Sequence, residues 1–415
     1  MLRKSGYSYK KNTEEIWKKD IEGEGKILKY ITFTVPCYNS EAYMERCIDS
    51  LLAGGEDVEI LIIDDGSTDR TGEIADYYEK LYPGIVRAVH KENGGHGSGV
   101  NEGLRRASGV YFKVVDSDDW LDETAYRELL HMIRFFCGTG SEQKTRKLQK
   151  KQNLKEMQNP KEKQKLKKTQ TMQEMGQSRE EEDNRLTEDQ PDLFVCNYVY
   201  DHLEEGRQTV VNYRNVFPRS CVCTWREIKR FKPSQYLVMH ALIFRTELLK
   251  KCGIRLPEHC FYVDNLFANQ PLPYVDKICY LNVDLYHYYL GREDQSVNER
   301  VLCNRIDQQI KVTNLVSRCT DLSIVEAKYP RLASYLCRNV SIMMAISSIH
   351  LLLIGDKEAY RKRKELWQGI RRDNKKLYYR LRFATISSLT YLPGALGRAL
   401  TLGGYRMARN LYQFQ

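Results

Sequence analysis

Residues 111–120 read Tyr-Phe-Lys-Val-Val-Asp-Ser-Asp-Asp-Trp, and this stretch decides the fold class. An apolar run of β character ends here in three carboxylates within four residues. These are Asp116, Asp118 and Asp119. Carboxylates packed this closely repel one another unless a cation neutralises them. The pattern predicts a divalent metal held by oxygen ligands, with a phosphate group sharing its coordination. The alternative is an acidic turn that caps a helix beginning near Asp122.

Strands and helices alternate on both sides of this stretch. Strand patterns cover residues 26–36, 58–63, 85–90 and 111–115, and helical patterns cover 40–52, 68–81 and 100–107, with a glycine-rich loop at 93–99. The second strand is a continuous apolar run, as in sheets covered on both faces. This alternation predicts an α/β fold with a Rossmann-like, mostly parallel sheet flanked by helices.

A charged segment interrupts the pattern. Residues 141–190 contain 13 Lys/Arg, 10 Asp/Glu and no aromatic residue, so they cannot bury enough surface to offset their conformational entropy. We therefore expect a surface insertion at 139–190, within a domain spanning 28–297 that follows an N-terminal extension at 1–27. After the insertion, the domain is predicted to contain a strand at 192–197, packed elements at 238–249 and 261–269, and a Tyr-rich strand pair at 277–289. A helical, basic region follows at 298–415.

Composition is typical of a globular protein with reduced thiols. The 415 residues are 42% hydrophobic and 29% charged, with a net charge of +10. The twelve Cys show no zinc spacing, which indicates buried thiols of a cytoplasmic protein. We expect no signal peptide, because residues 1–29 are polar. The most apolar stretch, 340–354, is expected to be a buried helix rather than a membrane span.

Polar residues follow three of the predicted strands. The first strand ends in Val-Pro-Cys-Tyr-Asn at 35–39, the second in Asp-Asp-Gly-Ser-Thr-Asp at 64–69, and the fourth in Asp-Ser-Asp-Asp at 116–119. Ligands of such sheets bind beyond the carboxyl ends of the strands, so these three segments are expected to meet in one crevice.

These motifs, with Asn-Gly-Gly at 93–95 and Asn-Glu-Gly at 101–103, resemble the family 2 inverting glycosyltransferases of GT-A fold, of the bacterial polysaccharide type. The resemblance is dense over residues 30–122 and looser to about residue 298. It implies a nucleotide-sugar donor, most often a UDP-sugar, with Mg²⁺ or Mn²⁺, and a hexosyl or N-acetylhexosaminyl transfer.

The resemblance also implies roles for particular residues. Asp65 would accept a hydrogen bond from the base, and Asp116 and Asp118 match the metal motif, with Asp119 as an alternative ligand. His96 would touch the diphosphate or sugar, or else be a loop histidine that faces solvent or caps the next helix. The remaining donor-binding residues are Pro36 and Tyr38 at the base and ribose, Asn39 beside them, and Asn93, Gly94 and Gly95, whose backbone approaches the nucleotide.

An inverting transfer needs a general base opposite the leaving diphosphate. The family usually carries this base in an acidic pair before a helix, and Asp264 matches it best, although Val263 stands where Glu is common. The alternative is that Asp264 caps the helix at 265–269. In the loop at 291–297, Arg292 would pair with phosphate, or else belong to a charged surface turn.

The C-terminal region is strongly basic. Residues 355–415 carry 14 Lys/Arg against 4 Asp/Glu, interleaved with aromatic and Leu residues. This pattern favours binding of the C-terminal region to an anionic membrane surface, at the inner face of the plasma membrane. The alternative is a helical face exposed to solvent. Nucleic acid is not expected, because no recognised nucleic-acid module is present.

These observations predict a cytoplasmic, metal-dependent inverting glycosyltransferase that acts on a glycan or lipid-linked acceptor. A sugar-phosphate nucleotidyltransferase of the same fold would need a glycine-rich, Arg/Lys-bearing loop after the first strand, where this chain has Pro36 to Asn39. A non-catalytic module that binds nucleotide-sugar or membrane is the second alternative.

Overall fold

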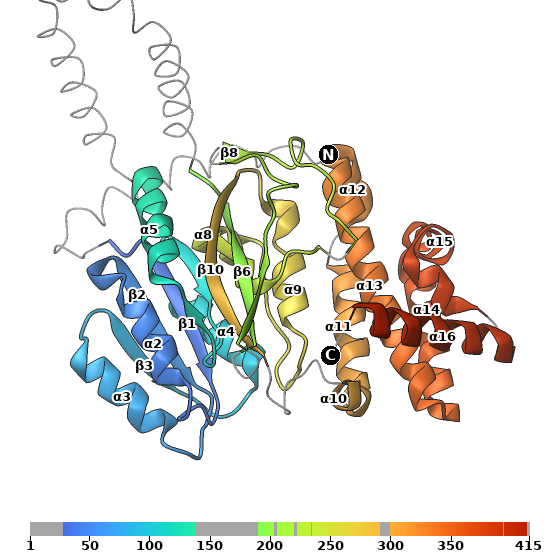
Figure 1. Cartoon of the computed structure of the whole chain (residues 1–415), viewed down its shortest axis with the longest axis horizontal. Coiled ribbons are helices and arrows are strands. Elements are labelled where there is room, and N and C mark those ends of the chain that lie inside the picture. The colour runs from blue at the N-terminus through green and yellow to red at the C-terminus, as the bar shows by residue number, and fades with distance from the viewer. Residues whose placement is uncertain are drawn as a thin grey trace, which may run out of the picture.

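The computed structural model describes residues 28–137, 190–202, 206–219, 222–233, 235–290, 299–319, 321–392 and 394–412. A sheet flanked by helices occupies the chain up to residue 290, and helices form the rest (Figure 1). The N-terminal extension and residues 139–189 of the insertion lie outside the described residues, so the domain boundaries stay predictions.

The first half of the sheet is parallel, as predicted. Strand β1 pairs with both β2 and β4, and β2 pairs with β3. All seven residues of β1 are buried, because helices cover both faces of the sheet. The strands are β1 (Ile31–Cys37), β2 (Val58–Asp64), β3 (Val86–His90) and β4 (Tyr111–Val114). The accompanying helices are α2 (Met44–Leu52), η1 (Gly55–Asp57), α3 (Thr71–Leu81), α4 (His96–Arg106) and α5 (Glu123–Cys137).

The second half of the sheet is mixed. Strand β9 is antiparallel to β4 and β6, whereas β6 and β10 are parallel, and the sheet order is β3-β2-β1-β4-β9-β6-β10-β5. The strands are β5 (Trp120–Leu121), β6 (Leu193–His202), β7 (Arg207–Val211), β8 (Val222–Cys223), β9 (Leu242–Arg245) and β10 (Ile278–Leu290). The short helices are η5 (Met239–Ala241), α8 (Thr246–Lys251), α9 (Asp264–Asn269) and η6 (Leu272–Tyr274).

Two predicted elements differ from the structure. The expected strand pair at 277–289 is one 13-residue strand, β10, which stays paired with β6 through two register shifts instead of turning back. The glycine-rich segment is not all loop, because α4 begins at His96 and takes in Gly97 and Gly99. A Cβ on Gly99 would lie 2.9 Å from Pro36, so glycine lets this helix lie close against β1.

Gly103 gives a stability prediction for this helix–strand contact. A Cβ there would lie 1.9 Å from Oγ1 of the buried Thr34, so we expect Gly103→Ala to lower the free energy of unfolding by about 1–3 kcal/mol. The matched control is Gly404→Ala on helix α16, where no atom lies within 4 Å and a gain of up to about 1 kcal/mol is expected. Denaturant unfolding measures both, and equal values for the two variants would contradict the packing argument.

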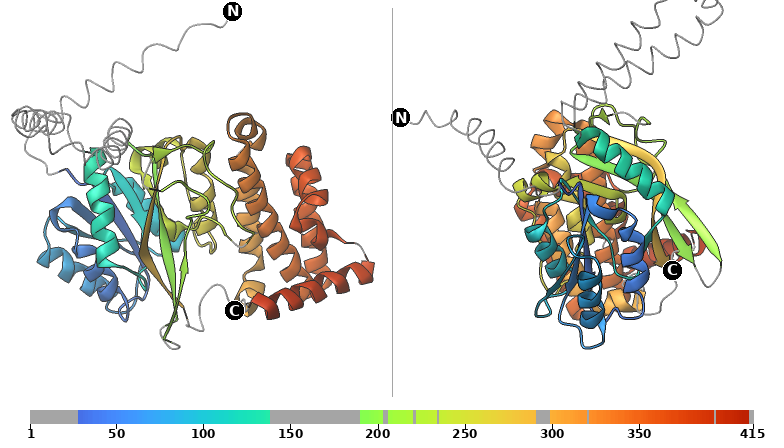
Figure 2. Two further views of the ribbon diagram at one scale, coloured as in Figure 1. Left: turned by 45° about the horizontal axis from the view of Figure 1, so that its top comes forward. Right: turned by 90° about the vertical axis from the view of Figure 1, so that its left-hand side faces the viewer.

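The C-terminal part is a set of packed helices beside the sheet part, and α11 contacts α9 (Figure 2). These are α10 (Glu299–Asn304), α11 (Ile306–Arg318), α12 (Leu322–Lys328), α13 (Pro330–Ile354), α14 (Lys357–Asp373), α15 (Lys375–Phe383), η7 (Ile386–Tyr391) and α16 (Gly394–Tyr412). Helix α13 is long and apolar enough to span a membrane, but 67% of its most apolar 18-residue stretch is buried inside the protein. This agrees with the predicted buried helix.

The cysteines of the described residues carry free thiols, as expected. None of these eleven forms a disulfide, and eight of them, including Cys37 and Cys47 beside the candidate site, are buried. Burial raises the pKa of both thiols well above its ordinary value, so they stay protonated at neutral pH.

Candidate active site at the carboxyl edge of the sheet

The ends of β1, β2 and β4 meet, as the sequence predicts. Asn39, which follows β1, accepts a hydrogen bond through Oδ1 from the backbone N–H of Thr68 at 2.9 Å, in the loop after β2. Ser40 Oγ lies 2.8 Å from Ser117 Oγ, in the turn after β4. The side chain of Tyr38 is 54% exposed at the same edge. One group of loops therefore carries all three motifs.

Asp65 fixes the glycine-rich turn before α4. Its side chain is buried and accepts hydrogen bonds from the backbone N–H groups of Gly94 (3.0 Å) and Gly95 (2.6 Å) and from Lys91 Nζ (2.6 Å). Asn93 Nδ2 donates to the backbone carbonyl of Asp65 at 2.9 Å. The predicted donor-binding segments are thus linked to one another, and the role of Asp65 toward a base stays a prediction.

His90 supports the neighbouring Asp64 and gives a pH-dependent stability prediction. Its Nδ1 lies 2.9 Å from Asp64 Oδ2 and its Nε2 lies 2.9 Å from Asp76 Oδ1. The hydrogen bonds with Asp64 and Asp76 raise the pKa of His90. The pair therefore stabilises the fold fully below the unfolded-state pKa of about 6.5, and this stabilisation is lost as the pH rises through the folded-state value.

We accordingly expect His90→Gln to lower the free energy of unfolding more at pH 5.5 than at pH 8.5. The loss at low pH should stay under about 1 kcal/mol, because the imidazole is 46% exposed and solvent screens both ion pairs. Denaturant unfolding at both pH values measures it, with exposed His131→Gln as the control. A loss that grows with pH would contradict the assignment.

Asp116 lies at the centre of the site. Its Oδ1 is 2.8 Å from Nε2 of His96, the first residue of α4, and its side chain is 24% exposed. Burial raises the pKa of Asp116, but the charge of His96 and its hydrogen bond outweigh burial, so the pKa is lowered overall. The histidine thus contacts the acidic motif. It is neither the cap of α4, a position that Gly95 holds, nor a loop residue that faces solvent.

Asp119 is held within the protein. It is fully buried; Oδ2 accepts a 2.5 Å hydrogen bond from the Tyr286 hydroxyl, and Oδ1 accepts one from the backbone N–H of Tyr289 at 2.9 Å. Burial and the charges of Asp118 and Asp116 raise the pKa of Asp119 well above its ordinary value. The three carboxylates therefore repel one another, as predicted for a cluster that receives a cation.

His240 joins this cluster, and sequence analysis missed it. Asp116, Asp119 and His240 each offer a ligand atom, and these atoms lie within 4.8 Å of one another. The imidazole stacks on Tyr286 and Tyr288, with ring centroids 4.6 and 4.7 Å away. Burial lowers the pKa of His240 to about 4, so the ring is neutral near pH 7 and can act as a ligand.

Asp264 lies near enough to His96 and Asp116 for their charges to act on its pKa. It is the first residue of α9, and the cap position is Val263, which makes no side-chain cap hydrogen bond. Burial raises the pKa of Asp264, the charge of His96 opposes the rise, and the charge of Asp116 adds to it. The preceding loop is fastened to the glycine-rich turn, because the backbone N–H of His259 donates to Gly94 O at 2.6 Å.

Aromatic side chains adjoin both acidic groups, and sequence analysis did not assign them to the site. Burial raises the pKa of Tyr288, and the charges of Asp119 and Asp116 add to the rise. Burial likewise raises the pKa of Tyr236, and the charge of Asp264 contributes. Tyr200 lies between them, 5.8 Å from Tyr288 by ring centroids. Arg292 lies outside the described residues, so its predicted role stays a prediction.

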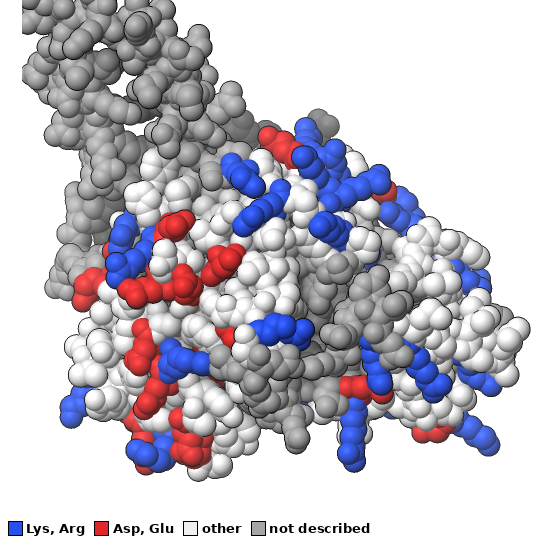
Figure 3. All heavy atoms as spheres, in the orientation of Figure 1, with Lys and Arg blue, Asp and Glu red and all other residues white. Residues whose placement is uncertain are grey.

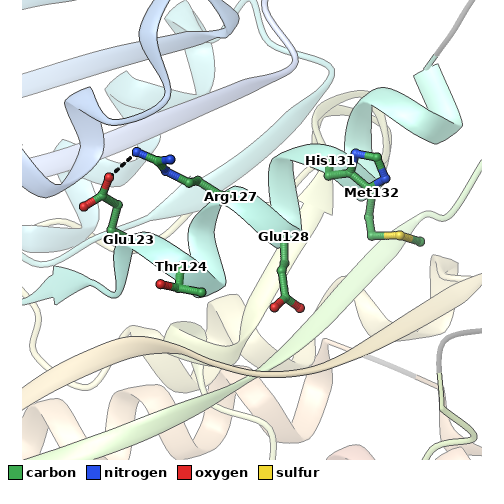
Figure 4. Close-up of a pocket in the computed structure, with 6 residues that line it drawn as sticks. All are labelled: Glu123, Thr124, Arg127, Glu128, His131 and Met132. Atoms are coloured by element: carbon green, nitrogen blue, oxygen red, sulfur yellow. Dashed lines mark hydrogen bonds and ion pairs between the residues drawn. The ribbon is translucent and has the colours of Figure 1, made fainter.

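One surface hollow lies away from these residues. It has a volume of about 640 Å³, and all six lining residues, Glu123, Thr124, Arg127, Glu128, His131 and Met132, come from α5 (Figure 4). An ion pair joins Glu123 and Arg127 across one helical turn. A depression along a single helix contains none of the predicted site residues, so the strand-end cluster remains the candidate site.

Comparisons with known proteins agree with this geometry. Residues 32–178 match the family model described as Glycosyl transferase family 2. A stretch of 104 residues is 39% identical to the uncharacterized glycosyltransferase EpsJ of Bacillus subtilis (strain 168), over 25% of this chain and 30% of that protein. A stretch of 99 residues is 38% identical to the poly(ribitol-phosphate) beta-glucosyltransferase of Bacillus spizizenii, over 23% of this chain and 16% of that protein. The matched stretches thus span less than a third of these relatives' lengths.

Solved structures share this fold. S. aureus TarS 1-349 superposes with a TM-score of 0.56 at 16% identity, over 93% of this chain and 91% of that one. The complex of TarS 1-349 with UDP-GlcNAc superposes with a TM-score of 0.54 at 18% identity, over 93% of this chain and 92% of that one. The fold and the site define a GT-A protein with a helical C-terminal region. Residues 32–178 form a glycosyl transferase family 2 domain by this match, and the prediction of this family is confirmed.

Proposed function

We propose that this chain is a metal-dependent inverting glycosyltransferase that moves one sugar from a UDP-sugar to a hydroxyl of a glycan or lipid-linked acceptor. The observation that carries the proposal is the meeting of two acidic groups in one site. His96 bonds Asp116, and the charges of His96 and Asp116 both act on Asp264. A transferase of this kind needs these two groups, one at the leaving diphosphate and one at the acceptor.

The donor would bind along the loops after β1, β2 and β4. Tyr38 is exposed there for contact with a base, and the turn at Asn93 to Gly95 presents backbone without side-chain bulk. TarS, which shares the fold, has a structure in complex with UDP-GlcNAc, and this supports a UDP-sugar carrying a hexose or N-acetylhexosamine.

The residues present fit a divalent cation. Asp116 is ionised and His240 is neutral, and a cation would balance the charges of Asp116 and Asp118 that add to the raised pKa of buried Asp119. Asp116 and Asp118 would hold Mg²⁺ or Mn²⁺, with Asp119 or His240 as further ligands. When bound, the metal supplies charge neutralisation for the diphosphate leaving group.

Asp264 would act as the general base. Its raised pKa makes the ionised carboxylate a better acceptor for the proton of the acceptor hydroxyl than an ordinary carboxylate. The hydroxyl oxygen then bonds to the anomeric carbon as the bond to the diphosphate breaks, which inverts the configuration. Arg292 would pair with the donor phosphate.

The acceptor would lie against Tyr200, Tyr236 and Tyr288, whose rings adjoin the base and the acidic motif. Rigid aromatic rings with a polar edge offer apolar contact and hydrogen bonds to a sugar or polyol. A relative is named for transfer to poly(ribitol-phosphate), which supports a cell-surface polymer or its lipid-linked precursor as acceptor and a cytoplasmic site of action.

Nucleotide release tests this proposal. Purified full-length protein is incubated with a panel of UDP-sugars and Mn²⁺ or Mg²⁺, and free UDP is measured. We expect release from at least one donor, and loss of release with a chelator. UDP binding without turnover on any donor would favour the non-catalytic module, and uridine triphosphate consumption with a sugar phosphate would favour the nucleotidyltransferase.

A further inference from the structure

Helix α16 carries an apolar stripe on its exposed side. Leu396, Leu400 and Met407 are 75%, 58% and 66% exposed, and Gly403 between them is exposed as well. Their spacing of four, three and four residues places them on one face of the helix. The opposite face is buried, and Thr401 there donates a hydrogen bond to the Leu389 carbonyl at 2.9 Å. Three large apolar side chains in one row are unusual on a soluble surface.

The preceding helix η7 packs against α16 and exposes apolar side chains as well. Ile386 and Leu389 of η7 are 60% and 61% exposed. Helix α16 is also fixed in place at its far end, because Tyr405 Oη donates to Glu299 Oε2 at 2.6 Å and Arg409 pairs with the same oxygen at 3.0 Å. The apolar face is therefore held on the folded helices.

The charge around this face is one-sided. Residues 374–415 contain seven Lys/Arg and no Asp or Glu. Arg398 and Arg406 belong to α16 itself. In Figure 3 the C-terminal helices are mostly uncharged, with more basic than acidic side chains, whereas most acidic side chains gather over the sheet part.

We infer that the exposed face of α16 and η7, here called the α16 face (Ile386, Leu389, Leu396, Leu400 and Met407), binds the surface of an anionic lipid bilayer. Apolar side chains in a row would enter the boundary between headgroups and acyl chains, and flanking Arg and Lys would meet the anionic headgroups. A second copy of this chain fits the face less well, because a two-fold contact would bring Arg398 and Arg406 of both copies together, and residues 374–415 contribute no acid to balance them.

This inference stands on surface residues outside the candidate active site. It gives the proposed transferase a place beside lipid-linked acceptors. The two claims remain separable, because vesicle binding can be measured without turnover and UDP binding without vesicles.

Vesicle co-sedimentation of the full chain tests the inference. We expect binding to phosphatidylglycerol vesicles at low salt, weaker binding in 0.5 M NaCl, and little binding to phosphatidylcholine. The triple variant Leu396→Asn, Leu400→Asn, Met407→Gln should bind at least about tenfold more weakly. The matched control is Ile324→Asn, which replaces a 71% exposed apolar residue on α12 and should bind as the wild type does.

The outcomes divide cleanly. Light scattering, circular dichroism and denaturant unfolding first verify that the triple variant is folded like the wild type. Wild-type protein that stays in the supernatant with phosphatidylglycerol, or a folded triple variant that sediments equally well, overturns the inference. So does a wild-type dimer in solution that the triple variant converts to a monomer while neither binds vesicles, because the α16 face would then be a self-contact.

Discussion

Asp264→Asn is expected to lower sugar transfer and donor hydrolysis by about 10²–10⁴-fold, the usual contribution of a general base. Asparagine keeps the size of the side chain but cannot take the proton of the acceptor hydroxyl. Binding of UDP with metal should change little, because Asp264 is assigned to the acceptor side of the sugar. The measurement is UDP release under saturating donor, together with calorimetry of UDP binding.

The matched control for this substitution is Asp307→Asn. Asp307 lies on α11, is 70% exposed and pairs with Lys362, so losing its charge should leave turnover unchanged. If Asp264→Asn turns over within a few-fold of the wild type, another residue is the base. If it loses UDP binding together with turnover, Asp264 supports the donor site rather than the acceptor hydroxyl.

The second large effect is expected at the metal motif. Asp116→Ala and Asp118→Ala should each weaken metal-dependent UDP binding by at least about 100-fold, because the diphosphate loses the cation that neutralises it. Calorimetry with Mn²⁺, and again with a chelator, measures this. The wild type should show a large difference between the two conditions, and the variants should show almost none.

Glu123→Gln is the control for removing a nearby negative charge. Glu123 follows β5, is 63% exposed and pairs with Arg127 on the outer face of α5. It should bind UDP as the wild type does. Unchanged metal-dependent affinity in both Asp variants would exclude the motif as the metal site. A loss in Asp116→Ala alone would leave Asp119 or His240 as its partner ligand.

The sequence predicts the part of this site at the ends of β1, β2 and β4, because each polar turn directly follows its strand in the chain. Each of β1, β2 and β4 is an apolar run followed at once by a polar turn, and parallel strands bring such turns together. The start of α4 at His96 was placed too late, since glycines there are selected by the close approach to β1 and to Pro257, which only the tertiary structure reveals.

The other half depends on contacts between distant segments. His240 reaches the acidic motif because β9 pairs with β4, more than a hundred residues earlier in the chain, and no spacing signals this. Tyr236 adjoins Asp264 for a similar reason. The basic charge of the C-terminal helices was visible in the sequence, but the exposed row on α16 appears only once the buried face of that helix is known.

The central claim is that donor diphosphate and metal bind at Asp116 and Asp118, facing Asp264. An anomalous difference map at the manganese edge, from crystals grown with UDP and Mn²⁺, tests it most directly. We predict one manganese peak within coordination distance of Asp116 or Asp118 and of the UDP diphosphate, with Asp264 on the open side of the β-phosphate. A peak bound elsewhere on the chain, or UDP placed away from the ends of β1, β2 and β4, would contradict the account.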